Sequence, residues 1–161
     1  METVPNVLTV QDFLRISAER DPDQLLLLHS DEALRYGDAD VASRSIAATL
    51  RSLGVGKGDR VVLALNNSAA YVIAYYAIVR AGGVVVPISP ETRLDGLAYT
   101  LNHCRAAVAV LETATADQVQ TGDEPLPYLH GLVAVGKSAS GTSQRYASAA
   151  WADALRASSS A

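Results

Sequence analysis

The stretch that decides the fold is LGVGKGDRVVLAL, at residues 53–65. Its first half is rich in glycine, which is typical of a tight turn. Its second half, Val61–Leu65, is an apolar run of strand length. Just upstream, Asp38–Leu53 repeats apolar residues at intervals of three and four, which predicts an amphipathic helix closed by Gly54. Helix, tight turn and buried strand in direct succession indicate an α/β unit.

The same alternation continues along the chain. A helix predicted to begin after Asn67 or Ser68 and to end near Ala81 is apolar nearly all round, so we expect it to be covered on most sides. Alternating strands and helices favour a parallel sheet. The predicted fold is α/β, with a mostly parallel sheet flanked by helices in three layers and a small antiparallel hairpin near the N-terminus. The other predicted elements are helices 9–20, 94–104 and 146–156, a hairpin within 25–36, and strands 84–86 (buried), 107–111 and 131–135.

Composition excludes several classes of protein. The chain has 161 residues, of which 49% are hydrophobic and 19% charged, which is the balance of one globular domain or part of one. Its net charge of −4 argues against a nucleic-acid partner, and its arginines are scattered without a block of like charge. No apolar run approaches a membrane span, and no basic segment precedes an apolar core at Met1, so we expect a cytoplasmic protein.

Candidate metal ligands and nucleophiles are few. The single cysteine, Cys104, excludes an internal disulfide and a cysteine-rich metal site. The histidines His29, His103 and His130 lie on separate predicted elements with no shared spacing, which does not favour a metal site. His103 and Cys104 are neighbours on a predicted helix and point in different directions, so they make a poor catalytic pair.

Several blocks, in order, resemble the start of the adenylate-forming superfamily, which includes acyl- and aryl-CoA ligases, peptide-synthetase adenylation domains and firefly luciferase. The blocks are LRYGDAD (34–40), LGVGKGDRV (53–61), Asn67-Ser68 with Tyr71, RAGGVVVP (80–87) and LAYTL (97–101). They resemble the family patterns L-T-Y-x-E-L-D, G-V-x-K-G-D-R-V, P-N-S-x-x-Y, K-A-G-G-x-x-V-P and L-x-Y-x-L. The residues that carry this structural signature are Gly54, Gly58, Asp59, Asn67, Ser68, Ala81, Gly82, Gly83, Pro87 and Pro90.

Two positions depart from the family pattern. Asn66 stands where the family usually has proline, before Asn67. Glu91 follows Pro90, where many CoA ligases carry arginine. The Pro-Glu pair resembles the amino-acid adenylation branch and some acyl ligases, and does not choose a substrate by itself.

The resemblance implies an enzyme that activates a carboxylic acid with ATP and Mg²⁺ as an acyl-AMP, then passes the acyl group to a thiol of CoA or of a carrier-protein phosphopantetheine. The family's ATP loop, [ST]-S-G-[ST]-T-G-x-P-K, does not occur in this sequence, and neither lysine matches the family's catalytic lysine. We therefore assign no catalytic, cofactor-binding or metal-binding residue. Residues 1–136 are predicted to be the N-terminal subdomain of such a ligase, and 137–161 a loop and terminal helix leading toward the missing ATP loop.

Two short motifs imitate phosphate-binding loops. GLVAVGKS (131–138) matches the P-loop pattern G-x-x-x-x-G-K-S, but its middle residues are those of a strand rather than a turn. Ser140-Gly141-Thr142-Ser143 resembles part of the family's ATP loop without its second glycine or its Pro-Lys. We interpret both as chance matches in a strand and a linker.

Two hypotheses about function remain open at this stage. The chain is either a fragment or subunit of an adenylate-forming ligase that is inactive on its own, or a stand-alone truncated homologue that acts as a non-catalytic binding or scaffold partner. Its expected partners are the remainder of the ligase, a homologous ligase or a carrier protein. An apolar face left uncovered by the missing remainder also predicts a homodimer. The residues that select the acid in this family lie beyond Ala161, so the sequence does not name the acid or the thiol acceptor.

Overall fold

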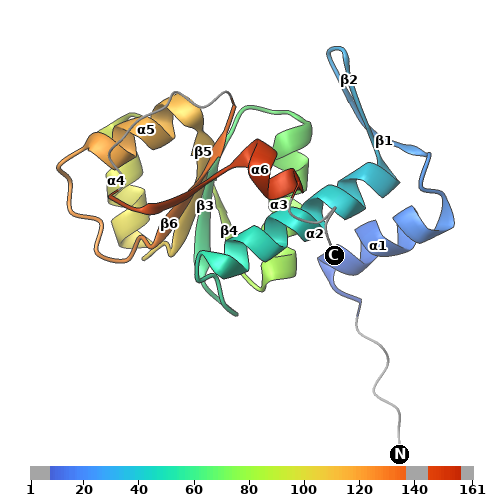
Figure 1. Ribbon diagram of the computed structural model, residues 1–161, viewed down its shortest axis with the longest axis horizontal. Helices are drawn as coiled ribbons and strands as arrows, with labels where there is room; N and C mark the ends of the chain where they lie inside the picture. The colour runs from blue at the N-terminus through green and yellow to red at the C-terminus, as the bar shows by residue number, and fades with distance from the viewer. Residues whose placement is uncertain (1–7, 137–144, 157–161) are drawn as a thin grey trace, which may run out of the picture.

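The computed structural model describes residues 8–136 and 145–156 as an α/β sandwich with a projecting hairpin (Figure 1). In chain order its elements are α1 (Val10–Arg20), β1 (Leu25–His29), β2 (Glu32–Arg35), α2 (Tyr36–Ser52), β3 (Arg60–Ala64), α3 (Ala69–Ala81), β4 (Val84–Pro87), α4 (Leu94–His103), β5 (Val108–Glu112), α5 (Thr113–Thr121), β6 (Gly131–Val135), β7 (Ala147–Ala150) and α6 (Trp151–Arg156).

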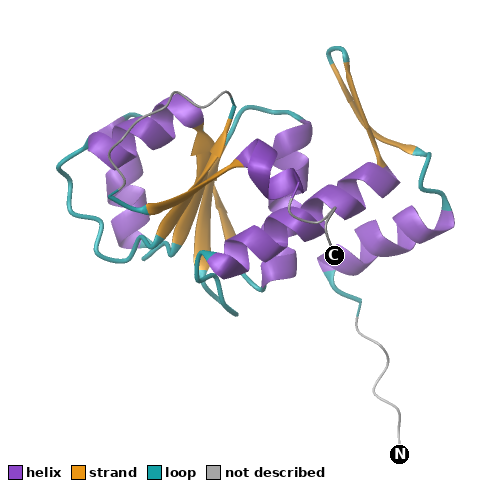
Figure 2. Ribbon diagram, in the orientation of Figure 1, coloured by secondary structure: helices purple, strands orange, loops and turns teal. Residues whose placement is uncertain are grey.

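The main sheet is parallel throughout and has the strand order β4-β3-β5-β6-β7. Because β3 lies between β4 and β5, the order reverses direction beside β3. The hairpin β1–β2 is antiparallel and stands apart from the sheet (Figure 2). The predicted fold class, a mostly parallel sheet flanked by helices with a small N-terminal hairpin, is confirmed.

Helices cover both faces of the sheet. Helices α2, α3 and α6 pack on one face, while α4 and α5 pack on the other (Figures 1 and 2). Each face of the sheet has its own hydrophobic core: the first core lies under α2, α3 and α6, and the second core lies under α4 and α5. Successive side chains of a strand point to opposite faces, so Val61 and Leu63 enter the first core and Val62 and Ala64 enter the second. All four are at most 4% exposed, which explains why β3 is a continuous apolar run rather than an alternating one.

The helix boundaries follow the residues that the sequence places there. The hydroxyl oxygen of Ser68 accepts a hydrogen bond from the backbone N–H of Tyr71 at 3.2 Å and so caps α3. Gly82 ends the same helix in the left-handed conformation, with φ +93°. At α1, the backbone N–H and the hydroxyl of Thr9 both donate to the carboxylate of Asp12, at 2.8 and 2.5 Å.

Three local predictions differ from the structure. The strand at 84–86, predicted to be buried, is the edge strand β4, and Val84 is 49% exposed. The single helix predicted over 146–156 is instead β7 followed by α6. Helix α5, between β5 and β6, was not predicted.

Strand β7 is attached to the sheet from two sides. Its residues pair in parallel with β6, with Ala147 opposite Gly131. The side-chain amide of Gln120 on α5 also donates to the carbonyl of Tyr146 and accepts from its N–H, both at 2.8 Å. This side chain substitutes for a neighbouring strand at the point where β7 begins.

Among the helices of residues 8–136 and 145–156, none combines the length and apolar character needed to cross a membrane.

Candidate functional site

The signature residues fall at two opposite edges of the main sheet. Gly54, Gly58 and Asp59 precede β3, and Ala81, Gly82 and Gly83 precede β4, so these six lie at the amino edge. Asn67, Ser68, Pro87 and Pro90 lie at the carboxyl edge, after β3 and at the end of β4. The two groups therefore form different structural neighbourhoods.

The amino-edge group joins two turns. The N–H of Gly58 donates to the carbonyl of Gly82 at 2.8 Å, and the N–H of Val84 donates to the carbonyl of Asp59 at 2.7 Å. The carboxylate of Asp59 accepts from the N–H of Gly56 at 2.8 Å, which closes the turn before β3. A side chain at Gly83 would meet the carbonyl oxygens of Asp59 and Ile78, both 3.2 Å from its Cβ. These residues therefore hold the start of β3 against the start of β4, and the backbone is closely packed at Gly83.

The carboxyl-edge group lies where ligands bind in open α/β sheets. Such ligands occupy the crevice outside the carboxyl ends of the strands, at the point where the strand order reverses. Here that point lies between β3 and β5. The backbone N–H and side-chain amide of Asn66 both point to one carboxylate oxygen of Glu112, at 3.3 and 3.4 Å, and connect the two strand ends. Asn66, which departs from the family proline, thus makes a contact that proline would lack.

A second polar feature adjoins this edge at the start of α5. The hydroxyl oxygen of Thr113 is buried and has no hydrogen-bond partner within the described residues. Gly136, at the end of β6 with φ +124°, approaches it closely, because a Cβ at Gly136 would lie 3.2 Å from that oxygen. Thr113 and Gly136 therefore meet where the paired strands β5 and β6 end.

Beside β3 and β5 the described polar side chains of this edge are neutral or acidic, while Arg93, 89% exposed, follows β4 at the same edge. Asn66 supplies an amide, Ser68 and Thr113 supply hydroxyls, and Glu112 supplies a carboxylate. None of these four groups carries the positive charge that stabilises a phosphate or a developing acyl-phosphate oxyanion. They can orient a ligand but do not form an adenylating constellation.

Of the two motifs that imitate phosphate-binding loops, only the first falls partly within the described residues. Gly131–Val135 is strand β6, so the middle residues of the P-loop match are a strand, as predicted. Lys137, Ser138 and the motif at 140–143 lie outside the described residues.

The remaining candidate side chains are dispersed. His29 ends β1, His130 precedes β6, and His103 ends α4, where its ring stacks on Tyr99 at a centroid distance of 5.4 Å. Cys104 follows α4 and is partly buried against the second core, and this burial raises the pKa of its thiol. In residues 8–136 and 145–156, no three or more His, Cys, Asp or Glu side chains group in a way that could hold a metal ion.

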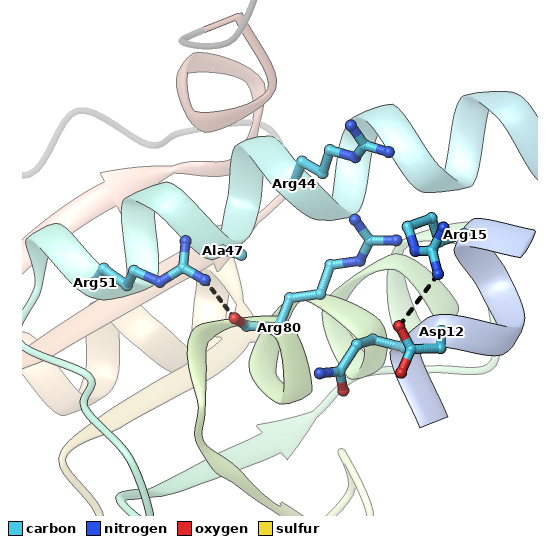
Figure 3. Close-up of a pocket in the computed structure, with 7 residues that line it drawn as sticks. Asp12, Arg15, Arg44, Ala47, Arg51 and Arg80 are labelled. Atoms are coloured by element: carbon cyan, nitrogen blue, oxygen red, sulfur yellow. Dashed lines mark hydrogen bonds and ion pairs between the residues drawn. The ribbon is translucent and has the colours of Figure 1, made fainter. Parts of the chain in front are cut away.

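One site was missed by sequence reasoning. Arginines that are scattered along the sequence meet where α1, α2 and α3 adjoin, around a pocket of about 220 Å³ (Figure 3). We call it the basic pocket; it is lined by Gln11, Asp12, Arg15, Arg44, Ala47, Arg51 and Arg80. The available signal was the spacing of Arg44 and Arg51, two helical turns apart on one face of α2. The contributions of α1 and α3 come only from tertiary packing.

The parallel sheet with the order β4-β3-β5-β6-β7 gives the fold, and comparison with known proteins gives the family. Residues 14–158 match the AMP-binding enzyme family, and the chain belongs to this family. Among curated relatives, it is 30% identical over 118 residues to tyrocidine synthase 2 of Brevibacillus parabrevis, covering 73% of this chain and 3% of that protein. It is 33% identical over 106 residues to the vibriobactin-specific 2,3-dihydroxybenzoate-AMP ligase of Vibrio cholerae, covering 66% of this chain and 20% of that protein.

Solved structures show the same fold. The anthranilate CoA ligase AuaEII in complex with anthranoyl-AMP superposes with a TM-score of 0.80 at 24% identity, covering 95% of this chain and 29% of that one. The N-terminal domain of FACL13 from Mycobacterium tuberculosis superposes with a TM-score of 0.73 at 21% identity, covering 91% and 35%. The present chain thus spans about a third or less of these relatives, and corresponds to part of their N-terminal domain.

Proposed function

We propose that this chain supplies the N-terminal subdomain of an adenylate-forming ligase, and that it does not form acyl adenylates on its own. The observation that carries the proposal is the family match over residues 14–158 of a chain that aligns with only 3% to 20% of those two curated relatives. Residues 1–136 form the subdomain in this proposal, and 137–161 lead toward the family's ATP loop.

Support for the proposed inactivity comes from the side chains beside β3 and β5. Forming an acyl adenylate requires the α-phosphate and the carboxylate to be held in line, with positive charge near the developing negative charge. Where the strand order reverses, the described polar side chains are Asn66, Ser68, Glu112 and Thr113, which are neutral or acidic, and the cation Arg93 lies at the far strand β4. The complete enzyme would use ATP, Mg²⁺ and a carboxylic acid, and would transfer the acyl group to CoA or a phosphopantetheine thiol.

Pyrophosphate release tests this proposal. The purified 161-residue chain is incubated with ATP, Mg²⁺ and a panel of aliphatic, aromatic and amino acids, and pyrophosphate is measured with a coupled assay. We expect the same rate with and without acid, equal to that of a heat-denatured sample. Release that depends on an added carboxylate would overturn the proposal.

The partner in this proposal is the remainder of a ligase, a homologous ligase or a carrier protein. When that partner is absent, a second copy of the chain covers the same apolar side chains and forms a homodimer. Support comes from large apolar side chains left exposed at α1 and the hairpin, although both faces of the sheet are covered. Phe13 is 58% exposed and Leu28 is 67% exposed. Exposed apolar side chains on neighbouring elements are a frequent mark of an interaction surface.

Light scattering as a function of concentration tests self-association. We expect the wild-type mass to rise above that of a monomer and the double variant Phe13→Gln, Leu28→Gln to remain monomeric. Tyr99→Gln is the matched control, because Tyr99 is 68% exposed on α4, on the opposite face of the sheet. A wild-type chain that stays monomeric at high concentration would contradict the proposed self-association.

A further inference from the structure

The basic pocket has a composition that the proposed function does not use. Four arginines from three helices line it: Arg15 on α1, Arg44 and Arg51 on α2, and Arg80 on α3. Figure 3 shows Arg80 extending between α2 and α1, with its guanidinium toward Arg44 and Arg15, while Arg51 lies toward the other end of the pocket. Packing of three helices, not local sequence, therefore concentrates the positive charge.

Carboxylates balance this charge only in part. Asp40 is shared, since Arg80 contacts one of its oxygens and Arg44 contacts the other at 2.5 Å. Arg15 pairs with Glu19 at 3.0 Å and with Asp12 at 3.6 Å. Arg51 donates to the backbone carbonyl of Arg80 and makes no ion pair within the described residues. Four guanidinium groups thus face three carboxylates, so the pocket keeps positive charge in a chain whose net charge is −4.

Donor capacity also remains unused. The Arg80 side chain is only 11% exposed, and its Nε is buried without a hydrogen-bond partner in the described residues. A buried guanidinium donor without an acceptor carries a desolvation cost, which an anion in the pocket would offset. Arg51 likewise has donors beyond the one used for the Arg80 carbonyl, since a guanidinium group carries five N–H donors.

We propose that the basic pocket binds the phosphate group of a small ligand. Guanidinium groups recognise phosphate by paired, charge-assisted hydrogen bonds, and their planar forks match its oxygens. The pocket volume of about 220 Å³ lies below the roughly 300–1,000 Å³ typical of sites for drug-sized ligands. It therefore suits an inorganic phosphate, a pyrophosphate or the phosphate end of a nucleotide, rather than a whole extended cofactor.

Titration calorimetry of the 161-residue chain with pyrophosphate, at constant ionic strength set by chloride, tests the proposal. We expect a saturable isotherm, which thermal unfolding reproduces as a rise in Tm with pyrophosphate over matched chloride. Inorganic phosphate and AMP are separate arms. AMP binding at least as strong as inorganic phosphate identifies a nucleotide phosphate as the source, and the reverse identifies a free anion; either supports a phosphate site.

Variants separate this pocket from diffuse attraction. Arg51→Gln removes an exposed guanidinium that makes no ion pair with any described residue, and should weaken pyrophosphate binding about tenfold, the loss expected for a charge-assisted hydrogen bond. Arg93→Gln is the matched control, because Arg93 is 89% exposed beside Asp95 and lies outside the pocket lining. It should leave the dissociation constant unchanged.

A gain-of-binding variant guards against simple unfolding. Asp12 is the carboxylate that lines the pocket, so Asp12→Asn should tighten pyrophosphate binding severalfold by removing repulsion. Damage to the fold would not tighten binding. Absence of a saturable isotherm in the wild-type chain, or equal weakening by Arg51→Gln and Arg93→Gln, would overturn the proposal.

Discussion

The N–H of Gly58 donates to the carbonyl of Gly82 at 2.8 Å, which connects the turn before β3 to the turn before β4. The two glycines have φ +84° and φ +93°, so both occupy the left-handed region that favours glycine. Two blocks of the family signature, GKGD and AGG, are therefore hydrogen-bonded to each other, and we call this connection the joint. This joint brings adjacent parallel strands into register at their starts and explains the pairing of Arg60 with Val84.

Replacing Gly82 tests the conformational demand of the joint. We expect Gly82→Ala to lower the free energy of unfolding by about 1–2 kcal/mol, the cost of placing an L side chain in the left-handed conformation. A Cβ at Gly82 would lie 3.4 Å from the Cα of Lys57, an ordinary contact, so the backbone conformation carries the cost. Gly82→Asn should lower the free energy of unfolding by a smaller amount, because asparagine tolerates this conformation better. Equal losses of unfolding free energy for Gly82→Ala and Gly82→Asn in urea denaturation would contradict this prediction and indicate steric crowding at Gly82.

The two ion pairs of Asp40 should contribute very different amounts to the free energy of unfolding. The side chains of Arg80 and Asp40 are 11% and 9% exposed, whereas Arg44 is 57% exposed. Arg80→Gln should cost about 2–3 kcal/mol, below the roughly 3–5 kcal/mol of a fully broken buried pair, since Arg44 stays with Asp40. Arg44→Gln should cost less than about 0.5 kcal/mol, as for exposed pairs. Similar losses for the two variants in urea denaturation would contradict this ranking.

The amide of Gln120 should control the order of β7. Gln120→Ala removes both hydrogen bonds to the backbone of Tyr146, with an expected loss of about 1–2 kcal/mol. Hydrogen exchange of the amides from Tyr146 to Ala150 should accelerate at the same time. Gln118→Ala is the control, because Gln118 is exposed on the same helix. If exchange in β7 is unchanged by Gln120→Ala, pairing with β6 alone holds the strand.

The thiol of Cys104 provides a pH-dependent prediction. Burial raises its pKa in the folded chain, so the folded state keeps its proton where the unfolded thiol, with a pKa of about 8.5, ionises. Folding stability should therefore fall as pH rises through this window. Burial also raises the pKa of Tyr76, but an unfolded tyrosine ionises near pH 10, so most of its contribution to the pH dependence lies above this window.

Comparison with Cys104→Ala isolates this contribution. Urea midpoints measured from pH 7.5 to 9.5 should decline more steeply for the wild type than for the variant. Alkylation of the folded wild-type thiol should also reach half its maximal rate at higher pH than alkylation in urea. Identical pH slopes for the two chains would contradict the prediction.

The sequence predicts elements well where local chemistry and tertiary structure agree. Ser68 as a helix cap, Gly82 as a helix end and the apolar run of β3 each combine a local preference with a matching place in the fold. The strand at Ala147–Ala150 shows the opposite case. Its Ala and Ser residues carry no strand preference, and alanine favours helix. It becomes a strand because β6 and Gln120 offer hydrogen-bond partners.

Spatial order and long-range sites are harder to predict. Val84–Val86 has the composition of a buried strand but lies at the sheet edge, because strand order depends on how successive units dock. Asn66 and Glu112 meet only because β3 and β5 are neighbours in the sheet. The basic pocket depends in the same way on three helices meeting, so the arginines that form it are scattered in the sequence.

We propose that this chain carries the fold of an adenylate-forming ligase without a working nucleotide site. Calorimetric titration of the chain and its Lys137→Ala variant with ATP and Mg²⁺ tests it most directly, because Lys137 is the lysine of the P-loop match. We expect Lys137→Ala to leave any affinity for ATP unchanged. A loss of ATP affinity of about tenfold or more in Lys137→Ala, with the fold intact by circular dichroism, would contradict it.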